Sequence, residues 1–141
     1  MQTIGATEVR KNWSSICDNV VRVRPNVIKR TRDYLFLSTR EDILAMLSGV
    51  KCTVSTIHEN DGSYTLATDE MDLAENADTE NQALMNLAAS ILEYAIEYYD
   101  NYQLYSRSPN RSGHLPYVTK AFLLDDAERI KEEMLCHDGK N

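Results

Sequence analysis

The sequence of 141 residues has only three cysteines and five glycines, and it has no long apolar run. The cysteines are far apart, which excludes a disulfide framework and a Cys-x-x-Cys zinc or redox motif. Five glycines leave little material for phosphate-binding loops, and neither G-x-x-x-x-G-K-S/T nor G-x-S-x-G occurs. No segment approaches the roughly 20 apolar residues of a membrane span, and the first residues do not resemble a signal peptide. We therefore expect a cytoplasmic protein with no membrane partner.

Patterns typical of catalytic or metal sites are also missing. The histidines at positions 58, 114 and 137 are not spaced as pairs of metal ligands. The acidic segment 69–72 lacks the spacing of an EF-hand calcium loop. No nucleophile can be paired with a base from the sequence alone. We therefore predict that the protein is not an enzyme and that it has neither a metal site nor a cofactor.

The formal net charge of −7 is unevenly distributed along the chain. Residues 1–50 carry 8 basic and 5 acidic side chains (+3), whereas residues 51–141 carry 7 basic and 17 acidic side chains (−10). Halves of opposite charge often bind different partners. The sequence thus predicts a basic N-terminal domain over residues 1–50 and an acidic C-terminal domain over residues 51–141.

The first half of the N-terminal domain is predicted to form a short strand over residues 2–5 and then one helix. Thr7 stands where an N-cap belongs, and Glu8 in the first turn is favoured by the helix dipole. Pro25 requires the helix to end by Arg24, because the residue before proline avoids helical backbone angles. The apolar positions at steps of three and four are Val9, Trp13, Ile16, Cys17, Val20 and Val21.

The second half of this domain is predicted to form a hairpin and a short helix. Residues 26–32 and 34–38 are β-branched, aromatic or apolar runs, which are typical of two strands joined by a tight turn. Ser38 or Thr39 can then cap a helix that Gly49 closes.

The acidic domain has an α+β pattern. Alternating runs over residues 51–57 and 63–67 flank an Asp-Gly turn, which predicts a β-hairpin. Residues 68–77 are acidic and are predicted to form a turn. Thr79 and Gln82 form a capping box before the longest helix, whose seam follows steps of three and four. The seam consists of Leu84, Ala88, Ile91, Ala95, Tyr98 and Tyr102.

A loop and two shorter helices are predicted to complete the chain. The loop, residues 106–116, contains Arg107, Arg111 and His114; it is either a binding site or a connection whose arginines pair with Glu93, Glu97 or Asp100. Pro116 starts one helix, and Asp125 or Asp126 caps the other. Residues 136–141 are expected to fray.

The N-terminal fifty residues resemble the Phd/YefM antitoxin family. The resemblance is carried by Ala6-Thr7-Glu8-Val9-Arg10-Lys11-Asn12 at a helix start, by the hairpin, and by Ser38 with the acidic pair Glu41-Asp42. Across its whole length the chain is similar to bacterial antitoxins of RelE/RelB-type toxin–antitoxin systems. The hairpin is shorter than is usual in the family and lacks its glycine, so Arg30 and Arg32 are both candidates for the DNA-contacting arginine.

The resemblance implies a homodimer whose N-terminal domain binds operator DNA and represses transcription of its own operon. The implied DNA-binding residues are Arg10, Lys11, Asn12, Lys29, Arg30 and Arg32. It also implies that the acidic domain binds a basic toxin, commonly a RelE-like ribonuclease. The candidate toxin-binding residues are Tyr98, Tyr102, Tyr105, Phe122, Ile130 and Met134. The alternative hypothesis is a dimeric DNA-binding regulator without a toxin.

Five tyrosines between positions 94 and 105 suggest two interpretations. Aromatic rings can stack on unpaired bases, but Glu93, Glu97 and Asp100 lie among these tyrosines and would repel phosphate. Their spacing favours packing in a core or an interface. We therefore expect DNA to bind through the basic domain only.

Overall fold

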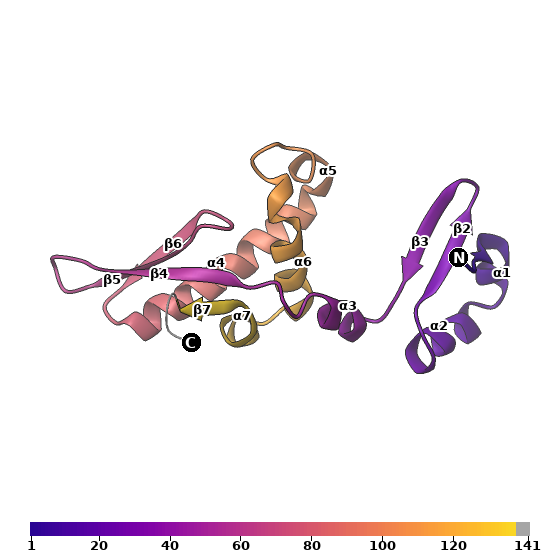
Figure 1. Cartoon of the computed structure of the whole chain (residues 1–141), viewed down its shortest axis with the longest axis horizontal. Helices are drawn as coiled ribbons and strands as arrows, with labels where there is room; N and C mark the ends of the chain where they lie inside the picture. Colours follow the sequence, from indigo (N-terminus) through magenta and orange to yellow (C-terminus); the bar gives the residue numbers. More distant parts are fainter. Residues whose placement is uncertain (138–141) are drawn as a thin grey trace. The chain divides into compact units, whose positions relative to one another are not determined.

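The protein has an α+β fold, and its computed structural model describes residues 1–137 (Figure 1). The chain divides into two compact units, Met1–Met46 and Leu47–Asn141, which we call unit 1 and unit 2. None of the helices in the described part is long and apolar enough to cross a membrane. Each unit has a small sheet and its own helices, so each is described separately.

Unit 1 contains a three-stranded sheet and three helices. The sheet order is β1-β2-β3, in which β1 and β2 are parallel and β2 and β3 are antiparallel. The register places Ile28 between Ile4 on one side and Leu35 on the other. The elements are β1 (Ile4–Gly5), α1 (Ala6–Lys11), α2 (Trp13–Arg22), β2 (Asn26–Arg30), β3 (Asp33–Leu37) and α3 (Arg40–Met46).

Three features of the helices in unit 1 differ from the sequence-based expectations. The expected single helix is interrupted at Asn12, whose φ of −121° is not helical and whose Nδ2 donates to Glu8 Oε2 at 2.8 Å. Thr7 is not the N-cap, because the helix already starts at Ala6 after an uncapped Gly5. Gly49 does not close α3, which ends at Met46.

The structure confirms the expected hairpin and one of the two candidate caps of α3. The turn between β2 and β3 contains Thr31, which adopts a left-handed φ of 57°. Thr39 caps α3, since its Oγ1 accepts a hydrogen bond from the backbone N–H of Asp42 at 3.1 Å.

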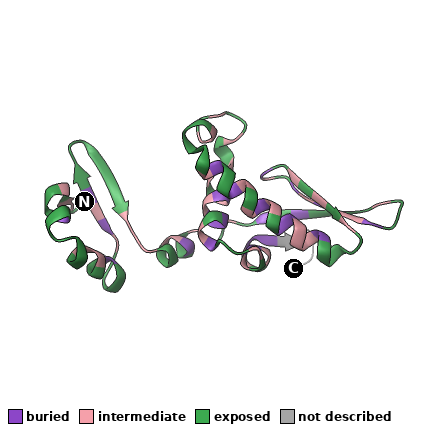
Figure 2. Cartoon of the chain, turned by 180° about the vertical axis from the view of Figure 1, so that it is seen from behind, coloured by how far each residue is buried: buried purple, intermediate pink, exposed green. Residues whose placement is uncertain are grey.

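Unit 1 buries few side chains. Across β1 to β3 and their two helices, the buried apolar residues are Val9, Val20 and Ile28. Asn26 is also buried, and its Nδ2 donates to Asn19 Oδ1 and to the carbonyl oxygen of Arg24, both at 3.0 Å. Strand β3 is exposed over most of its length (Figure 2). A small core and an open edge strand leave unit 1 with exposed apolar surface.

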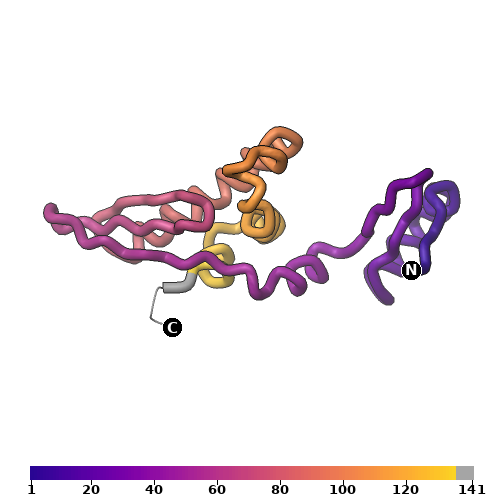
Figure 3. The backbone as a smooth tube through the Cα atoms, turned by 45° about the horizontal axis from the view of Figure 1, so that its top comes forward, coloured from indigo at the N-terminus to yellow at the C-terminus, as the bar shows by residue number. Residues whose placement is uncertain are grey.

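Unit 2 contains a four-stranded sheet packed against α4, with α6 and α7 against the same helix (Figures 1 and 3). The strand order is β6-β5-β4-β7, and β7 runs parallel to β4. The elements are β4 (Cys52–His58), β5 (Tyr64–Thr68), β6 (Leu73–Ala77), α4 (Glu80–Asp100), α5 (Tyr102–Tyr105), the 3₁₀ helix η1 (Ser112–His114), α6 (Leu115–Leu124), α7 (Ala127–Met134) and β7 (Leu135–His137).

Two strands of unit 2 were not expected from the sequence. The acidic segment after β5 turns at Asp72, with φ of 55°, and then pairs with β5 as β6. Glu75 projects toward α4, where its Oε2 accepts a hydrogen bond from Ser90 Oγ at 2.6 Å. Residues 136 and 137, which were expected to fray, belong to β7 beside β4; residues 138–141 lie outside the described part.

Helix caps define the ends of α4 and α7. Thr79 Oγ1 accepts from the backbone N–H of Gln82 at 3.1 Å, but the Gln82 side chain donates to Asn86 instead of completing the capping box. Asp126 caps α7 by accepting from the backbone N–H groups of residues 128 and 129. Asp125 is not a cap of α7, because it ends α6 in the left-handed conformation.

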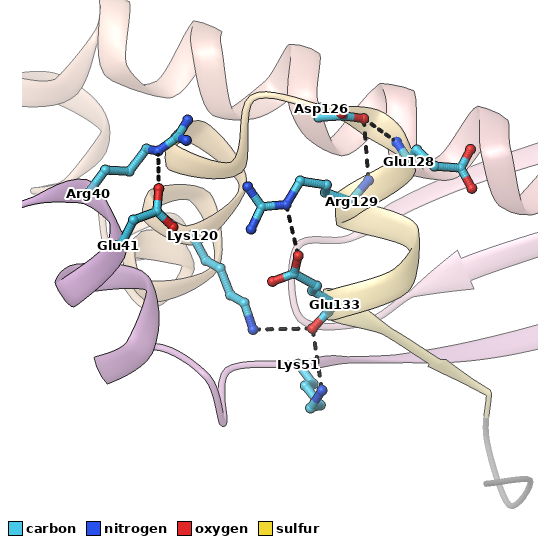
Figure 4. Close-up of polar contacts among 8 residues, drawn as sticks. All are labelled: Arg40, Glu41, Lys51, Lys120, Asp126, Glu128, Arg129 and Glu133. Carbon is cyan, nitrogen blue, oxygen red and sulfur yellow. Dashed lines mark hydrogen bonds and ion pairs between the residues drawn. The ribbon is translucent and has the colours of Figure 1, made fainter.

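A buried lysine joins distant segments of unit 2. Lys120 on α6 is only 2% exposed. Its Nζ donates to the carbonyl oxygens of Ser48 and Val50 at 3.4 and 2.9 Å. It also donates to the carbonyl oxygen of Glu133 at 3.2 Å (Figure 4). The nearby Lys51 donates to the same Glu133 carbonyl. Because a buried ammonium group requires such acceptors, this contact holds the start of β4 against the end of α7.

An aromatic cluster at the end of α4 surrounds Arg111. The guanidinium carbon lies 4.0 Å from the centre of the Tyr105 ring, and Arg111 Nη1 is 4.0 Å from Glu97 Oε2. The Tyr98 hydroxyl donates to the carbonyl oxygen of Arg111 at 3.0 Å. Tyr94 Oη lies 2.6 Å from Nδ1 of His114. Burial and the positive charge of Arg111 lower the pKa of His114, so the folded protein favours the neutral ring.

We predict that stability decreases in acid because His114 must become protonated there. Folding lowers the pKa of His114 below its unfolded value of about 6.5. The contribution of His114 to the free energy of unfolding is therefore fully present above about pH 6.5, and it is lost as the pH falls through the folded pKa. In His114→Asn, the amide oxygen can still accept from Tyr94 but does not titrate. Urea unfolding at about pH 8 and about pH 5 should therefore show a smaller loss for the variant than for the wild type. Equal losses in the two proteins would contradict the prediction.

Candidate functional site

A basic hollow in unit 1 lies between the start of α1 and the hairpin turn. It has a volume of about 670 Å³. Arg10 comes from α1, whereas Lys29 and Arg30 come from the end of β2. The parallel pairing of Gly5 with Lys29 brings these two sequence regions together. The lining residues are Gly5, Ala6, Thr7, Arg10, Lys29, Arg30 and Thr31.

The cations around the basic hollow have no ion-pair partner in the described part of the chain. Arg10, Lys29 and Arg30 are exposed. Among the described residues, the ion pairs within 4 Å include neither these three residues nor Lys11 and Arg32. Unpaired cations gathered on one surface attract a polyanion, since each contact with a phosphate can release a counterion.

The other three residues predicted to bind DNA lie outside the lining of the hollow. Lys11 is exposed at the last position of α1. Asn12 lies between α1 and α2, and its side-chain amide is bound to Glu8, so its role in the structure is to end α1. Arg32 is exposed in the hairpin turn next to Thr31. Of the two candidate arginines in the hairpin, Arg30 is the one that lines the hollow.

Unit 1 also exposes large apolar side chains. Leu35 and Phe36 on the edge strand β3 are 50% and 56% exposed, and Trp13 on α2 is 52% exposed. Val21 and Val23 at the end of α2 are about 70% exposed. Large apolar side chains with this degree of exposure are typical of an interface with another protein. The expected helix stripe included Trp13 and Val21, but the structure leaves both of them outside the core.

The residues predicted to bind a toxin have different environments in unit 2. Tyr98, Ile130 and Met134 have no exposed surface, so their side chains pack in the core and cannot reach a docked partner. Tyr102 and Phe122 are 41% and 37% exposed. Tyr105, on α5, is half-buried against Arg111.

Sequence patterns did not identify every residue of these surfaces. Gly5, Ala6 and Thr7 line the basic hollow through the start of α1, but their residue types carry no binding signal. The positions of Leu35 and Phe36 are typical of an ordinary strand, so the sequence does not distinguish them from buried strand residues. The structure shows that both are about half-exposed. In residues 1–137, no group of three or more His, Cys, Asp or Glu side chains is placed to hold a metal ion.

Comparisons with known proteins agree on one family. A PHD-like family described as "Antitoxin of toxin-antitoxin, RelE / RelB, TA system" matches residues 1–136. A crystal structure from Syntrophomonas wolfei subsp. wolfei superposes with a TM-score of 0.90 and 33% sequence identity, covering 98% of this chain and 99% of that chain. That protein is described as the antitoxin part of a proposed toxin/antitoxin system. A search of curated proteins found no match. The chain therefore belongs to the PHD-like family of antitoxins of RelE/RelB toxin–antitoxin systems.

Proposed function

We propose that this antitoxin binds its own operator through unit 1 and a RelE-like toxin through unit 2. The observation that carries the first part is the basic hollow, in which Arg10, Lys29 and Arg30 are gathered without ion-pair partners in the described part of the chain. DNA phosphates suit such a surface, because each one presents a fixed negative charge to an exposed cation. Autorepression of this kind would take place in the cytoplasm.

Operator binding is proposed to require a homodimer formed by unit 1. A 46-residue unit has too little interior to cover Trp13, Leu35 and Phe36, and these side chains remain about half-exposed. Pairing two copies would bury this surface. It would also double the number of cations available to the duplex, and Arg10 and Arg30 are proposed as the main contacts, with Lys11, Asn12, Lys29 and Arg32 beside them.

Toxin binding is proposed to use a surface that is already folded in the free antitoxin. Unit 2 has a closed core in which Leu87, Ile91 and Tyr98 are fully buried, and α4 is capped by Thr79. A chain with this interior does not need a partner in order to fold. Residues 51–141 also carry an excess of acidic side chains, which would steer a basic toxin toward this unit.

Replacing Arg10 and Arg30 with Ala should weaken operator binding. Each substitution removes a cation from both copies of the dimer, so we expect affinity to fall about tenfold or more and the salt dependence to become shallower. Titration of the promoter DNA upstream of the gene at several salt concentrations measures both effects. Arg22→Ala is the matched control, because Arg22 is exposed at the end of α2 and does not line the hollow. Affinity equal to that of the control would refute the proposed DNA site.

The substitution Phe36→Asp should convert the dimer into a monomer. A charge on β3 would have to be buried at the proposed interface, which costs several kcal/mol. Sedimentation equilibrium should give the mass of two chains for the wild type and of one chain for the variant. Ile57→Asp, at a residue of unit 2 that is 53% exposed, is expected to keep the dimer. If the wild type sediments as a monomer, this interface does not exist.

Co-expression tests the proposed toxin. If the product of the adjacent gene is a RelE-like ribonuclease, its induction should stop growth, and this antitoxin should restore growth and copurify with it. A variant lacking operator binding, Arg10→Ala with Arg30→Ala, should still restore growth when expressed from an unrelated promoter, since neutralisation is proposed to use unit 2. Failure of the wild-type chain to bind the adjacent product would favour a DNA-binding regulator without a toxin.

A further inference from the structure

The helix α4 has a second apolar stripe besides the one that packs in the core. Its core stripe is buried at Leu87, Ala88, Ile91, Ala95 and Tyr98. The second stripe follows steps of 4, 3, 4 and 3 residues, so its members lie along one face of the helix. It consists of Met85, Ala89, Leu92, Ile96 and Tyr99.

This second stripe remains accessible to a partner. Ala89 and Ile96 are exposed, the latter at 42%, whereas Met85, Leu92 and Tyr99 are half-buried. Figure 2 shows buried, intermediate and exposed residues alternating along α4. Phe122 of α6 stacks on Tyr99 with a centroid distance of 4.2 Å and is itself 37% exposed. The stripe and Phe122 thus form one continuous apolar surface, which we call the outer ridge.

The charged side chains of α4 beside the outer ridge are acidic. Helix α4 carries Glu93, Glu97 and Asp100 in its second half and has no lysine or arginine. In α6 the only charged residue is Lys120, which is buried. Glu97 lies near Arg111, but no ion pair within 4 Å involves Glu93 or Asp100 in the described part of the chain. These two carboxylates are exposed and available for a cationic partner.

We propose that the outer ridge is the docking surface for a basic helix of the cognate toxin, which deepens and rests on the toxin binding proposed above. Side chains spaced by three and four residues form ridges that fit the grooves of another helix. Lysine or arginine residues flanking an apolar stripe on that helix would lie opposite Glu93 and Asp100. A second copy of this chain fits less well, because its own carboxylates would then face these carboxylates.

The central test is Ile96→Glu measured against the purified product of the adjacent gene. Ile96 is partly exposed, so the free variant should fold with an unchanged circular dichroism spectrum and melting temperature. We expect binding to weaken at least about 30-fold, the loss typical of an interface hot spot. The matched control is Ile57→Glu, which adds the same charge at an exposed apolar residue of β4, and it should bind like the wild type.

Charge reversal tests whether Glu93 and Asp100 attract the basic helix of the toxin. The double variant Glu93→Lys with Asp100→Lys should associate about tenfold more slowly at low salt, and the difference should shrink at high salt because ions screen the steering. The control is Asp69→Lys with Glu132→Lys, which makes the same change in net charge at two exposed acidic residues outside the ridge. Equal rates for the two double variants would overturn the electrostatic part of the proposal.

The outcomes separate this inference from the proposed function. If the wild-type chain binds the adjacent product and Ile96→Glu binds equally well, the outer ridge is not the docking surface, but toxin binding stands. If the wild-type chain does not bind, toxin binding fails and the inference fails with it. If Ile96→Glu instead lowers the mass of the free protein in sedimentation equilibrium, the ridge is an interface between copies of this chain, and the proposal is wrong.

Discussion

The ammonium group of Lys120 is the contact on which the arrangement of unit 2 depends. It is buried, and it donates to carbonyl oxygens at Ser48, Val50 and Glu133. These acceptors come from the segment that leads into β4 and from the end of α7, about 70 and 13 positions away in sequence. A buried charge is stable only with such hydrogen-bond partners. The contact therefore fixes the segment before β4 next to the end of α7. The parallel pairing of β4 with β7 begins immediately after these residues.

Unit 1 is stabilised in a different way. Its strands and two helices bury three apolar side chains, whereas Trp13, Leu35 and Phe36 remain exposed. In small domains the interior is limited, and association with another chain often supplies the missing burial. The proposed dimer would therefore stabilise unit 1 and complete its proposed DNA-binding surface at the same time. Unit 2 already has a closed core, so its proposed role requires only an exposed surface.

Local signals predicted the turns and most helices, but contacts between distant residues decided the remaining features. The Asp-Gly turn and the Thr79 cap follow from neighbouring residues, and the structure confirms them. The helix expected to start at Pro116 is also present, but it begins one residue earlier, at Leu115. Strand β6 reads as an acidic turn because its apolar positions are few, and pairing with β5 overrides that local preference. Periodicity alone could not show whether Ile130 and Met134 are buried or exposed, because the apolar residues of a core stripe and of a binding stripe have the same spacing.

The same ambiguity explains why charge is the better guide to function in this chain. Helix α4 has two apolar stripes of equal period, and only one of them is buried. What distinguishes the other is its border of carboxylates without basic neighbours on α4. Likewise, the sequence does not show that the hairpin cations of unit 1 lie near Arg10. The pairing of β1 with β2 places Lys29 and Arg30 beside Arg10 in one basic hollow. The net charge of −7 therefore combines two surfaces of opposite sign, each suited to a partner that the other would repel.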